Sequence, residues 1–126
     1  METKRILIVD DDADFVLAVR MILESAGYVV EDAPNGAAGL KKMRANRPNL
    51  VLMDVMMTSP LDGYYATQAI SDDPELSQVP VLMVSSIAST EHAGSFPTDQ
   101  YLNIVDFVAK PPDPQQLLAK VKTWIK

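Results

Sequence analysis

The sequence contains no cysteine, no basic run longer than two residues and no long apolar stretch. The absence of cysteine excludes disulfide bonds and thiolate metal sites. Because the formal net charge is −6 and Lys and Arg are scattered, we expect no direct contact with nucleic acid. The apolar runs are much shorter than the roughly 20 residues of a membrane span, and no signal-peptide core follows the N-terminus. We therefore expect a cytoplasmic protein without a membrane partner.

Size and composition indicate a single globular domain over residues 1–126. Apolar residues make up 48% of the 126 positions and charged residues 22%, proportions that are ordinary for a folded domain. Internal repeats, low-complexity tracts and an obvious linker are absent from the sequence. A chain of this length forms one compact core, so we look for one principal site.

Five short apolar runs predict β-strands. They cover residues 5–10, 28–33, 49–54, 79–85 and 104–109. In three of them, at 6–9, 50–53 and 81–84, apolar residues follow one another without polar alternation. Continuous apolar strands are typical of parallel sheets that are buried on both faces, so helices must cover both sides.

Helical spacing between these runs predicts the covering layers. The first helix ends at Gly27, a residue suited to a left-handed C-cap. Its apolar stripe comprises Phe15, Val19, Ile22, Leu23 and Ala26. A second helix is predicted after its N-cap, Asn35, and must end before Pro48. A third covers residues 63–71.

The last predicted helix has the clearest beginning, with Asp113 as N-cap and Pro114 at the first helical position. Its apolar stripe comprises Leu117, Leu118, Val121, Trp124 and Ile125. Residues 88–101 mix polar residues, glycine and proline without such a stripe, so we expect a short or irregular fourth helix there. This alternation predicts an α/β fold with a doubly wound, five-stranded parallel sheet and five helices.

Chemically distinctive residues stand where four of the predicted strands end. They are Asp10, Asp11 and Asp12 after the first strand, Asp54 at the third, Ser85 at the fourth, and Lys110 with Pro111 at the fifth. The carboxyl ends of parallel strands border one crevice, so we expect these side chains to meet. Clustered carboxylates repel one another unless a cation lies among them, and an all-oxygen cluster suits Mg²⁺, for which Mn²⁺ could substitute. Lys110 supplies further positive charge.

The motifs Ile-Leu-Ile-Val-Asp-Asp-Asp at 6–12, Leu-Val-Leu-Met-Asp at 50–54 and Lys-Pro at 110–111 resemble those of response-regulator receiver domains. The resemblance extends over essentially the whole chain. It implies a flavodoxin-like sheet with strand order 2-1-3-4-5 and a function in two-component signal transduction. Asp54 would accept a phosphoryl group from a sensor histidine kinase or a phosphotransfer protein. The domain would then change its contacts with an unknown downstream protein, and it would catalyse only its own phosphorylation and dephosphorylation.

The same resemblance implies the residues of a metal site. Asp10 and Asp11 would hold Mg²⁺, together with Asp54 and the backbone carbonyl of Met56. Asp12 would instead cap the first helix.

It also implies the residues that bind and report the phosphoryl group. Ser85 and Lys110 would each bind a phosphoryl oxygen. Phe107 would move inward as the switch residue when Ser85 is drawn to the phosphate. The peptide bond between Lys110 and Pro111 would be cis.

Two segments depart from the family pattern. The family usually reads Asp-x-x-Met-Pro-x-x-Asp-Gly after the acceptor, whereas residues 54–63 read Asp-Val-Met-Met-Thr-Ser-Pro-Leu-Asp-Gly, with one extra residue after Met57. The interval from Ser85 to Lys110 is also longer than in typical members. We expect a bulged loop beside the acceptor and an altered output surface around residues 88–101.

Three other functions are compatible with parts of this pattern. A pseudo-receiver that binds partners without being phosphorylated would share the fold and most motifs. A Mg²⁺-dependent aspartyl-phosphate phosphatase would use Asp10 and Asp12 but would leave Asp54 without a role. A flavodoxin-like electron carrier would need a phosphate-binding loop after the first strand, where three aspartates would repel the flavin phosphate.

Overall fold

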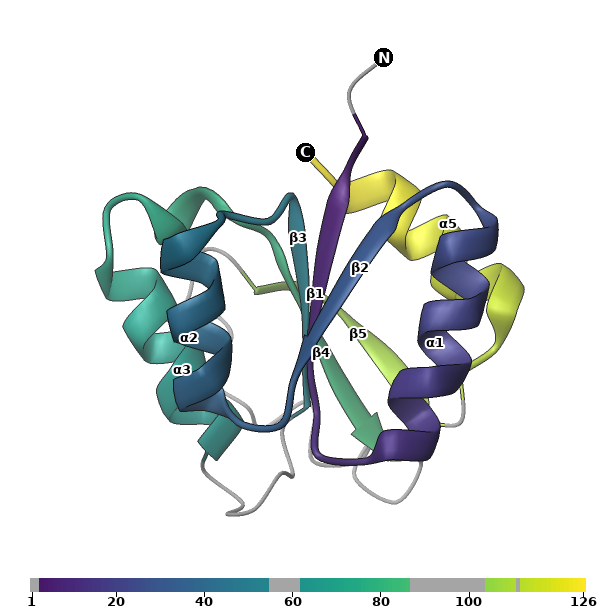
Figure 1. Cartoon of the computed structure of the whole chain (residues 1–126), viewed down its shortest axis with the longest axis horizontal. Coiled ribbons are helices and arrows are strands. Elements are labelled where there is room, and N and C mark those ends of the chain that lie inside the picture. The colour runs from purple at the N-terminus through teal and green to yellow at the C-terminus, as the bar shows by residue number, and fades with distance from the viewer. Residues whose placement is uncertain (1–2, 55–61, 87–103, 111) are drawn as a thin grey trace.

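The computed structural model describes residues 3–54, 62–86, 104–110 and 112–126, and it contains a five-stranded sheet between two helical layers (Figure 1). The strands are β1 Arg5–Val9, β2 Val29–Ala33, β3 Leu50–Asp54, β4 Val81–Ser86 and β5 Ile104–Lys110. All neighbouring pairs are parallel, and the strand order is β2-β1-β3-β4-β5. The predicted doubly wound, flavodoxin-like sheet is therefore confirmed.

The helices divide between the two faces of the sheet. α1 (Ala13–Ser25) and α5 (Pro114–Trp124) cover one face, and α2 (Gly36–Ala45) and α3 (Asp62–Asp72) cover the other (Figure 1). A short 3₁₀ turn, η1 (Leu76–Gln78), leads into β4. The described residues thus contain four of the five predicted α-helices, and the predicted fourth helix falls within residues 87–103, which are not described. In the described ranges, no helix has the length and apolarity needed to cross a membrane.

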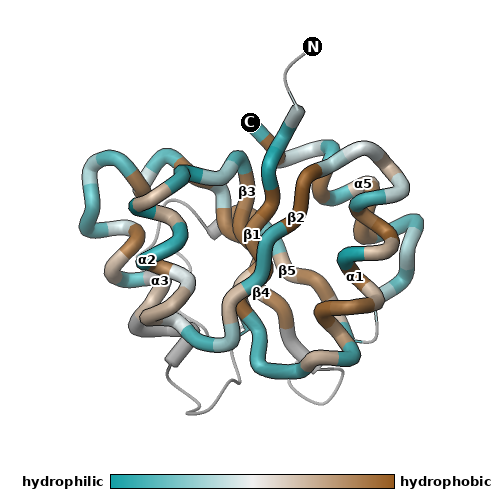
Figure 2. Tube along the Cα trace, in the orientation of Figure 1, coloured by the Kyte–Doolittle hydropathy of each residue, from teal (hydrophilic) through white to brown (hydrophobic). Residues whose placement is uncertain are grey.

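Alternate side chains of each strand enter two separate cores. Ile6 and Ile8 of β1 pack with α1 and α5, whereas Leu7 and Val9 pack with α2 and α3. The same alternation holds in β3 and β4, because successive side chains of a strand point to opposite faces. The apolar strands form the centre of the molecule (Figure 2). This two-sided burial is the reason for the unbroken apolar runs in the sequence.

Local signals set the helix ends as expected. The side chains of Asp12, Asn35 and Asp113 accept backbone N–H bonds at the starts of α1, α2 and α5. Gly27, after α1, has a positive φ of 97°, a conformation that glycine adopts without steric cost. These ends place the first residues of α1 beside the carboxyl end of β1.

Two local expectations were wrong. The fourth strand begins at Val81 instead of Val79, because the chain from Leu76 closes a 3₁₀ turn that ends at Val79. Trp124, predicted on the buried stripe of α5, is 37% exposed, and its indole N–H donates to Asp106 Oδ2 at 3.2 Å. Because Trp124 is the last residue of α5, its ring lies at the border of the core instead of within it.

Candidate functional site

The carboxyl ends of β1 and β3 lie side by side at the centre of the sheet. The helix that follows β1 covers one face and the helix that follows β3 covers the other (Figure 1). Divergent connections of this kind leave a crevice at the strand ends, where open α/β sheets bind ligands. Asp10 directly follows β1, and Asp54 is the last residue of β3.

Three carboxylates meet in this crevice. One oxygen each from Asp10, Asp11 and Asp54 lies within 4.8 Å of the others. Asp10 and Asp54 are each 3% exposed, and they are the only buried charged residues in the described part of the chain. Asp11 is exposed. The site therefore has a buried acidic floor and one carboxylate at its mouth.

The backbone around α1 fixes the carboxylate of Asp10. Its Oδ1 accepts the N–H of Asp12 at 2.9 Å, and its own N–H donates to Ala33 O at 3.0 Å. Asp12 in turn caps α1, so one residue orders both the helix start and the carboxylate. The second oxygen, Oδ2, is buried and makes no hydrogen bond with the described residues.

The ammonium of Lys110, at the end of β5, enters the acidic cluster. Its Nζ lies 2.9 Å from Asp10 Oδ2, an ion pair not aligned as a hydrogen bond, and 3.4 Å from Asp54 Oδ2. The same nitrogen lies 4.7 Å from the centre of the Phe15 ring. The lysine side chain is 18% exposed. One cation thus faces two buried carboxylates and one aromatic ring.

Burial and mutual charge shift the acid–base behaviour of this cluster. Burial raises the pKa of Asp10 from 3.8 to about 6, and the charge of Asp54 acts in the same direction. The N–H of Asp12 and the Lys110 ammonium oppose the rise. For Lys110, burial lowers the pKa, but the two carboxylates outweigh it, and the net pKa is raised. The lysine therefore stays protonated, while Asp10 resists ionisation.

The donor set suits a divalent cation. Ligand oxygens lie about 2.1 Å from Mg²⁺, so opposite ligands stand about 4.2 Å apart, close to the span of this cluster. Asp10 and Asp54 are both buried and share the ammonium of Lys110, so a divalent cation would offset the negative charge that one lysine leaves. Asp10, Asp11 and Asp54 therefore form a cluster that is compatible with a metal site.

A groove of about 330 Å³ opens next to the acidic cluster. It is lined by Asp10, Asp11, Ala13, Val16, Leu17, Arg20, Asp32 and Pro34. Leu17 and Met21, one turn apart on α1, are 61% and 66% exposed. Arg20 donates to Asp32 Oδ2 at 2.8 Å, which ties α1 to β2 along one side of the groove.

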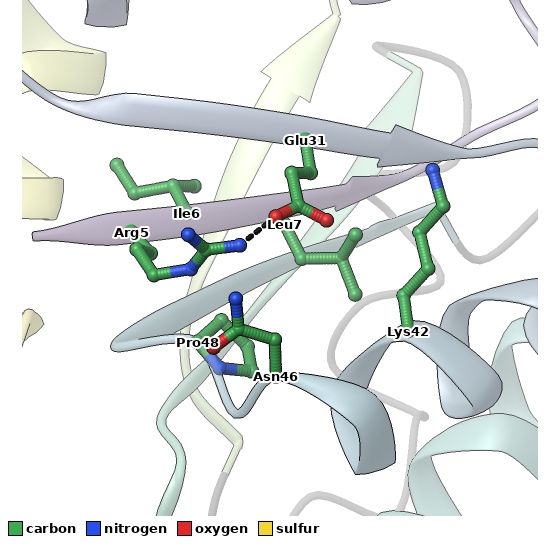
Figure 3. A pocket seen from close by; sticks show the side chains of 7 residues that line it. All are labelled: Arg5, Ile6, Leu7, Glu31, Lys42, Asn46 and Pro48. Atoms are coloured by element: carbon green, nitrogen blue, oxygen red, sulfur yellow. Dashed lines mark ion pairs between the residues drawn. The ribbon is translucent and has the colours of Figure 1, made fainter.

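A second, much smaller cavity of about 10 Å³ lies near the amino ends of β1 and β2 (Figure 3). There Arg5 forms an ion pair with Glu31, and Asn46 faces them from α2's end. Both charged side chains are partly exposed, at 30% and 38%. The cavity has room for about one water molecule and is too small for a substrate.

The structure brings together four of the residues predicted to form the site: Asp10, Asp11, Asp54 and Lys110. Phe107 is half-buried against the core under α2 and α3. The backbone of Ser85 is in register with Ala109 of β5, one residue before Lys110, but the Ser85 side chain is not described. Other expectations fall outside the described residues: the Met56 carbonyl, the extra residue after Met57 and the cis bond at Pro111.

Sequence reasoning missed the part that Phe15 plays beside the site. It assigned this ring to the apolar stripe of α1, where the ring indeed packs with 6% exposure. Its contact with Lys110 joins positions 95 residues apart, and no local pattern reveals such a pair. The only available signal was that the ring stands in the first turn after the acidic run.

Comparison with known proteins matches this arrangement. A family model described as the response regulator receiver domain matches residues 6–122. The transcriptional regulatory protein CseB of Streptomyces avermitilis is 34% identical over 129 residues, which include 99% of this chain and 50% of CseB. The CAI-1 autoinducer sensor kinase/phosphatase CqsS of Vibrio cholerae is 32% identical over 123 residues, 97% of this chain and 17% of CqsS.

A solved structure shows the same architecture. The Vibrio cholerae chemotaxis protein CheY4 superposes with a TM-score of 0.86 at 25% identity, covering 98% of this chain and 100% of that one. By contrast, this chain spans about half the length of the curated transcriptional regulators it matches.

Proposed function

This chain belongs to the response regulator receiver domain family, and on that premise we propose that Asp54 accepts a phosphoryl group and thereby switches protein contacts. Receiver domains act in two-component signal transduction and are in general not enzymes. The observation that carries the proposal is the Lys110 ammonium among buried carboxylates from two other strands. Residues 1–126 would form one receiver domain, working in the cytoplasm.

The acceptor step uses a carboxylate oxygen of Asp54 as nucleophile. This oxygen forms a bond to phosphorus while the bond from phosphorus to the donor breaks, and the electron pair of that bond leaves with the donor. With a phosphohistidine donor, the broken bond is phosphorus–nitrogen and the imidazole departs. Lys110 is close enough to Asp54 to exchange its contact there for a phosphoryl oxygen, which neutralises part of the added charge.

The metal in this proposal is Mg²⁺, with Mn²⁺ as a substitute. Asp10, Asp11, Asp54 and the backbone carbonyl of Met56 would hold it. When bound, it supplies positive charge that offsets the negative charge of the transferring group. The chain's own contribution is to keep Asp10 fixed through the N–H of Asp12, so that the carboxylate does not need to be ordered on binding.

The switch would run through Ser85 and Phe107. In the proposal, the Ser85 hydroxyl binds a second phosphoryl oxygen, and the ring of Phe107 moves inward behind it, with a cis bond at Pro111. Lys120 of α5 donates to the backbone carbonyl of Phe107 and pairs with Asp106 at 3.5 Å. These contacts support the idea that a movement of β5 at Phe107 would be felt by α5.

The phosphoryl donor would be a sensor histidine kinase or a phosphotransfer protein. Its histidine must reach the crevice, and the groove beside Asp10 and Asp11 borders that crevice. The exposed apolar side chains of Leu17 and Met21 lie on the helix that forms this groove. Similarity to part of the sensor kinase CqsS agrees with a partner of this class. The protein that reads the phosphorylated state is the downstream partner.

The proposal is tested by incubating the protein with Mg²⁺ and acetyl phosphate and measuring its intact mass. We expect the parent to gain the mass of one phosphoryl group and the Asp54→Asn variant to gain none. The matched control is Asp32→Asn, which changes a nearby groove carboxylate that lies outside the acidic cluster, and it should gain the group as the parent does. A parent that gains no mass, and does not bind beryllofluoride, would instead be a pseudo-receiver that works without phosphorylation.

A further inference from the structure

We propose that Phe15 is a positioning residue for phosphorylation, because its ring holds the Lys110 ammonium at the acceptor site through a cation–π contact. The distance from Lys110 Nζ to the ring centre is 4.7 Å, within the roughly 6 Å over which such contacts act. This inference rests on the proposed function, since it assigns Phe15 a part in the reaction at Asp54.

The ring is held rigidly enough to position a neighbour. Phe15 is 6% exposed and belongs to the core cluster between the sheet, α1 and α5. It stands in the first turn of α1, where Asp12 Oδ1 accepts its N–H at 3.2 Å. The cap and the core thus fix the ring on the same helix turn that follows Asp10.

Lys110, in contrast, has a long and flexible side chain that needs several contacts to stay in one place. In the structure its Nζ lies 2.9 Å from Asp10 Oδ2 and 3.4 Å from Asp54 Oδ2. A divalent cation bound by the same carboxylates would compete with both of these ion pairs. Mg²⁺ takes oxygen ligands, so the contact between the ring and the ammonium does not compete with metal binding.

The ring therefore keeps Lys110 beside Asp54 when the carboxylates are bound to the divalent cation. An aliphatic side chain of similar size would fill the core equally well but would not attract a cation. The role predicted for Phe15 is electrostatic, and it can be separated from packing.

The test replaces Phe15 with mono-, tri- and pentafluorinated phenylalanine, which nearly preserve the shape of the ring while progressively removing the negative electrostatic potential at its face. We expect the maximal rate of phosphorylation by acetyl phosphate to fall in that order, by about three- to tenfold for the pentafluorinated ring. Mg²⁺ affinity should change less than the rate. Phe15→Leu should resemble the pentafluorinated protein, and Phe15→Tyr should retain most of the parent rate.

Two further measurements separate positioning from stability. Leu23→Val loosens the same core at the far end of α1, and it should lower the melting temperature without lowering the rate. In the metal-free parent, NMR should show the ε-methylene protons of Lys110 shifted upfield by the ring, and Phe15→Leu should abolish that shift.

The outcomes are distinct. Equal rates across the fluorinated series, in a parent that does gain the phosphoryl group, would overturn the positioning role and leave the proposed function intact. The same holds if the Lys110 protons show no ring-induced shift. A parent that gains no phosphoryl group would overturn both proposals.

Discussion

The two ends of the sheet differ in how their charged side chains are buried and balanced. Near its amino end, Arg5 and Glu31 pair one to one, and both side chains keep about a third of their surface in solvent. At the carboxyl end, one ammonium faces two buried carboxylates, with a third at the mouth. The sheet therefore carries a balanced, partly exposed ion pair near one end and an excess of buried negative charge at the other.

This difference separates a structural end from the end that we propose to be functional. A partly exposed ion pair contributes little to stability and is easily replaced. Buried carboxylates without enough positive charge cost stability, and the raised pKa of Asp10 reflects that cost. A cation that binds at such a site offsets this cost and stabilises the folded protein. A metal-dependent phosphoryl acceptor requires a site of this kind.

The largest expected effect comes from removing the cation at the carboxyl end. Lys110→Met leaves the carboxylates of Asp10 and Asp54 without their shared partner, and we expect a loss of about 3–5 kcal/mol of unfolding free energy at pH 7 without metal. Glu31→Gln, which breaks the pair at the amino end, should cost about 0.5 kcal/mol. Urea denaturation of both variants measures the difference. Equal losses would mean that the two ends do not differ as described.

A smaller effect is expected from adding the metal. At a Mg²⁺ concentration ten times its dissociation constant, binding to the folded state alone stabilises by about 1.4 kcal/mol. Mg²⁺ should therefore raise the melting temperature of the parent, and it should raise that of Asp10→Asn far less. If Glu31→Gln also lost the shift, the metal would be acting outside the acidic cluster.

The most gradual of these effects is a dependence on pH, because it extends from pH 3.8 to about 6. The pKa of Asp10 is about 6 in the folded protein against its ordinary value of 3.8, so the folded state holds this proton more tightly. Stability from this group is present below pH 3.8 and is lost as the pH rises to about 6, by an amount that reaches about 3 kcal/mol. Denaturation curves of metal-free Asp10→Asn, measured over a series of pH values, should lack this loss of unfolding free energy. If the free energy of unfolding changed with pH equally in the parent and the variant, Asp10 would ionise freely.

The strand ends could be predicted because each depends on a local pattern. Asp54 and Lys110 follow apolar runs, and parallel topology alone brings the ends of such runs to one edge. The N-cap at Asp12 was equally local. The contact between Phe15 and Lys110 could not be predicted in this way, because it depends on how α1 packs against β5. The exposure of Trp124 depends on where α5 ends relative to the sheet.

The central claim is that the phosphoryl group resides on Asp54. The direct measurement is to treat the Mg²⁺- and acetyl phosphate-exposed protein with borohydride, which converts an aspartyl phosphate to homoserine, and to map the product by peptide mass spectrometry. We predict homoserine at position 54 and at no other aspartate. Homoserine at position 10 or 11, or none at all, would contradict the account.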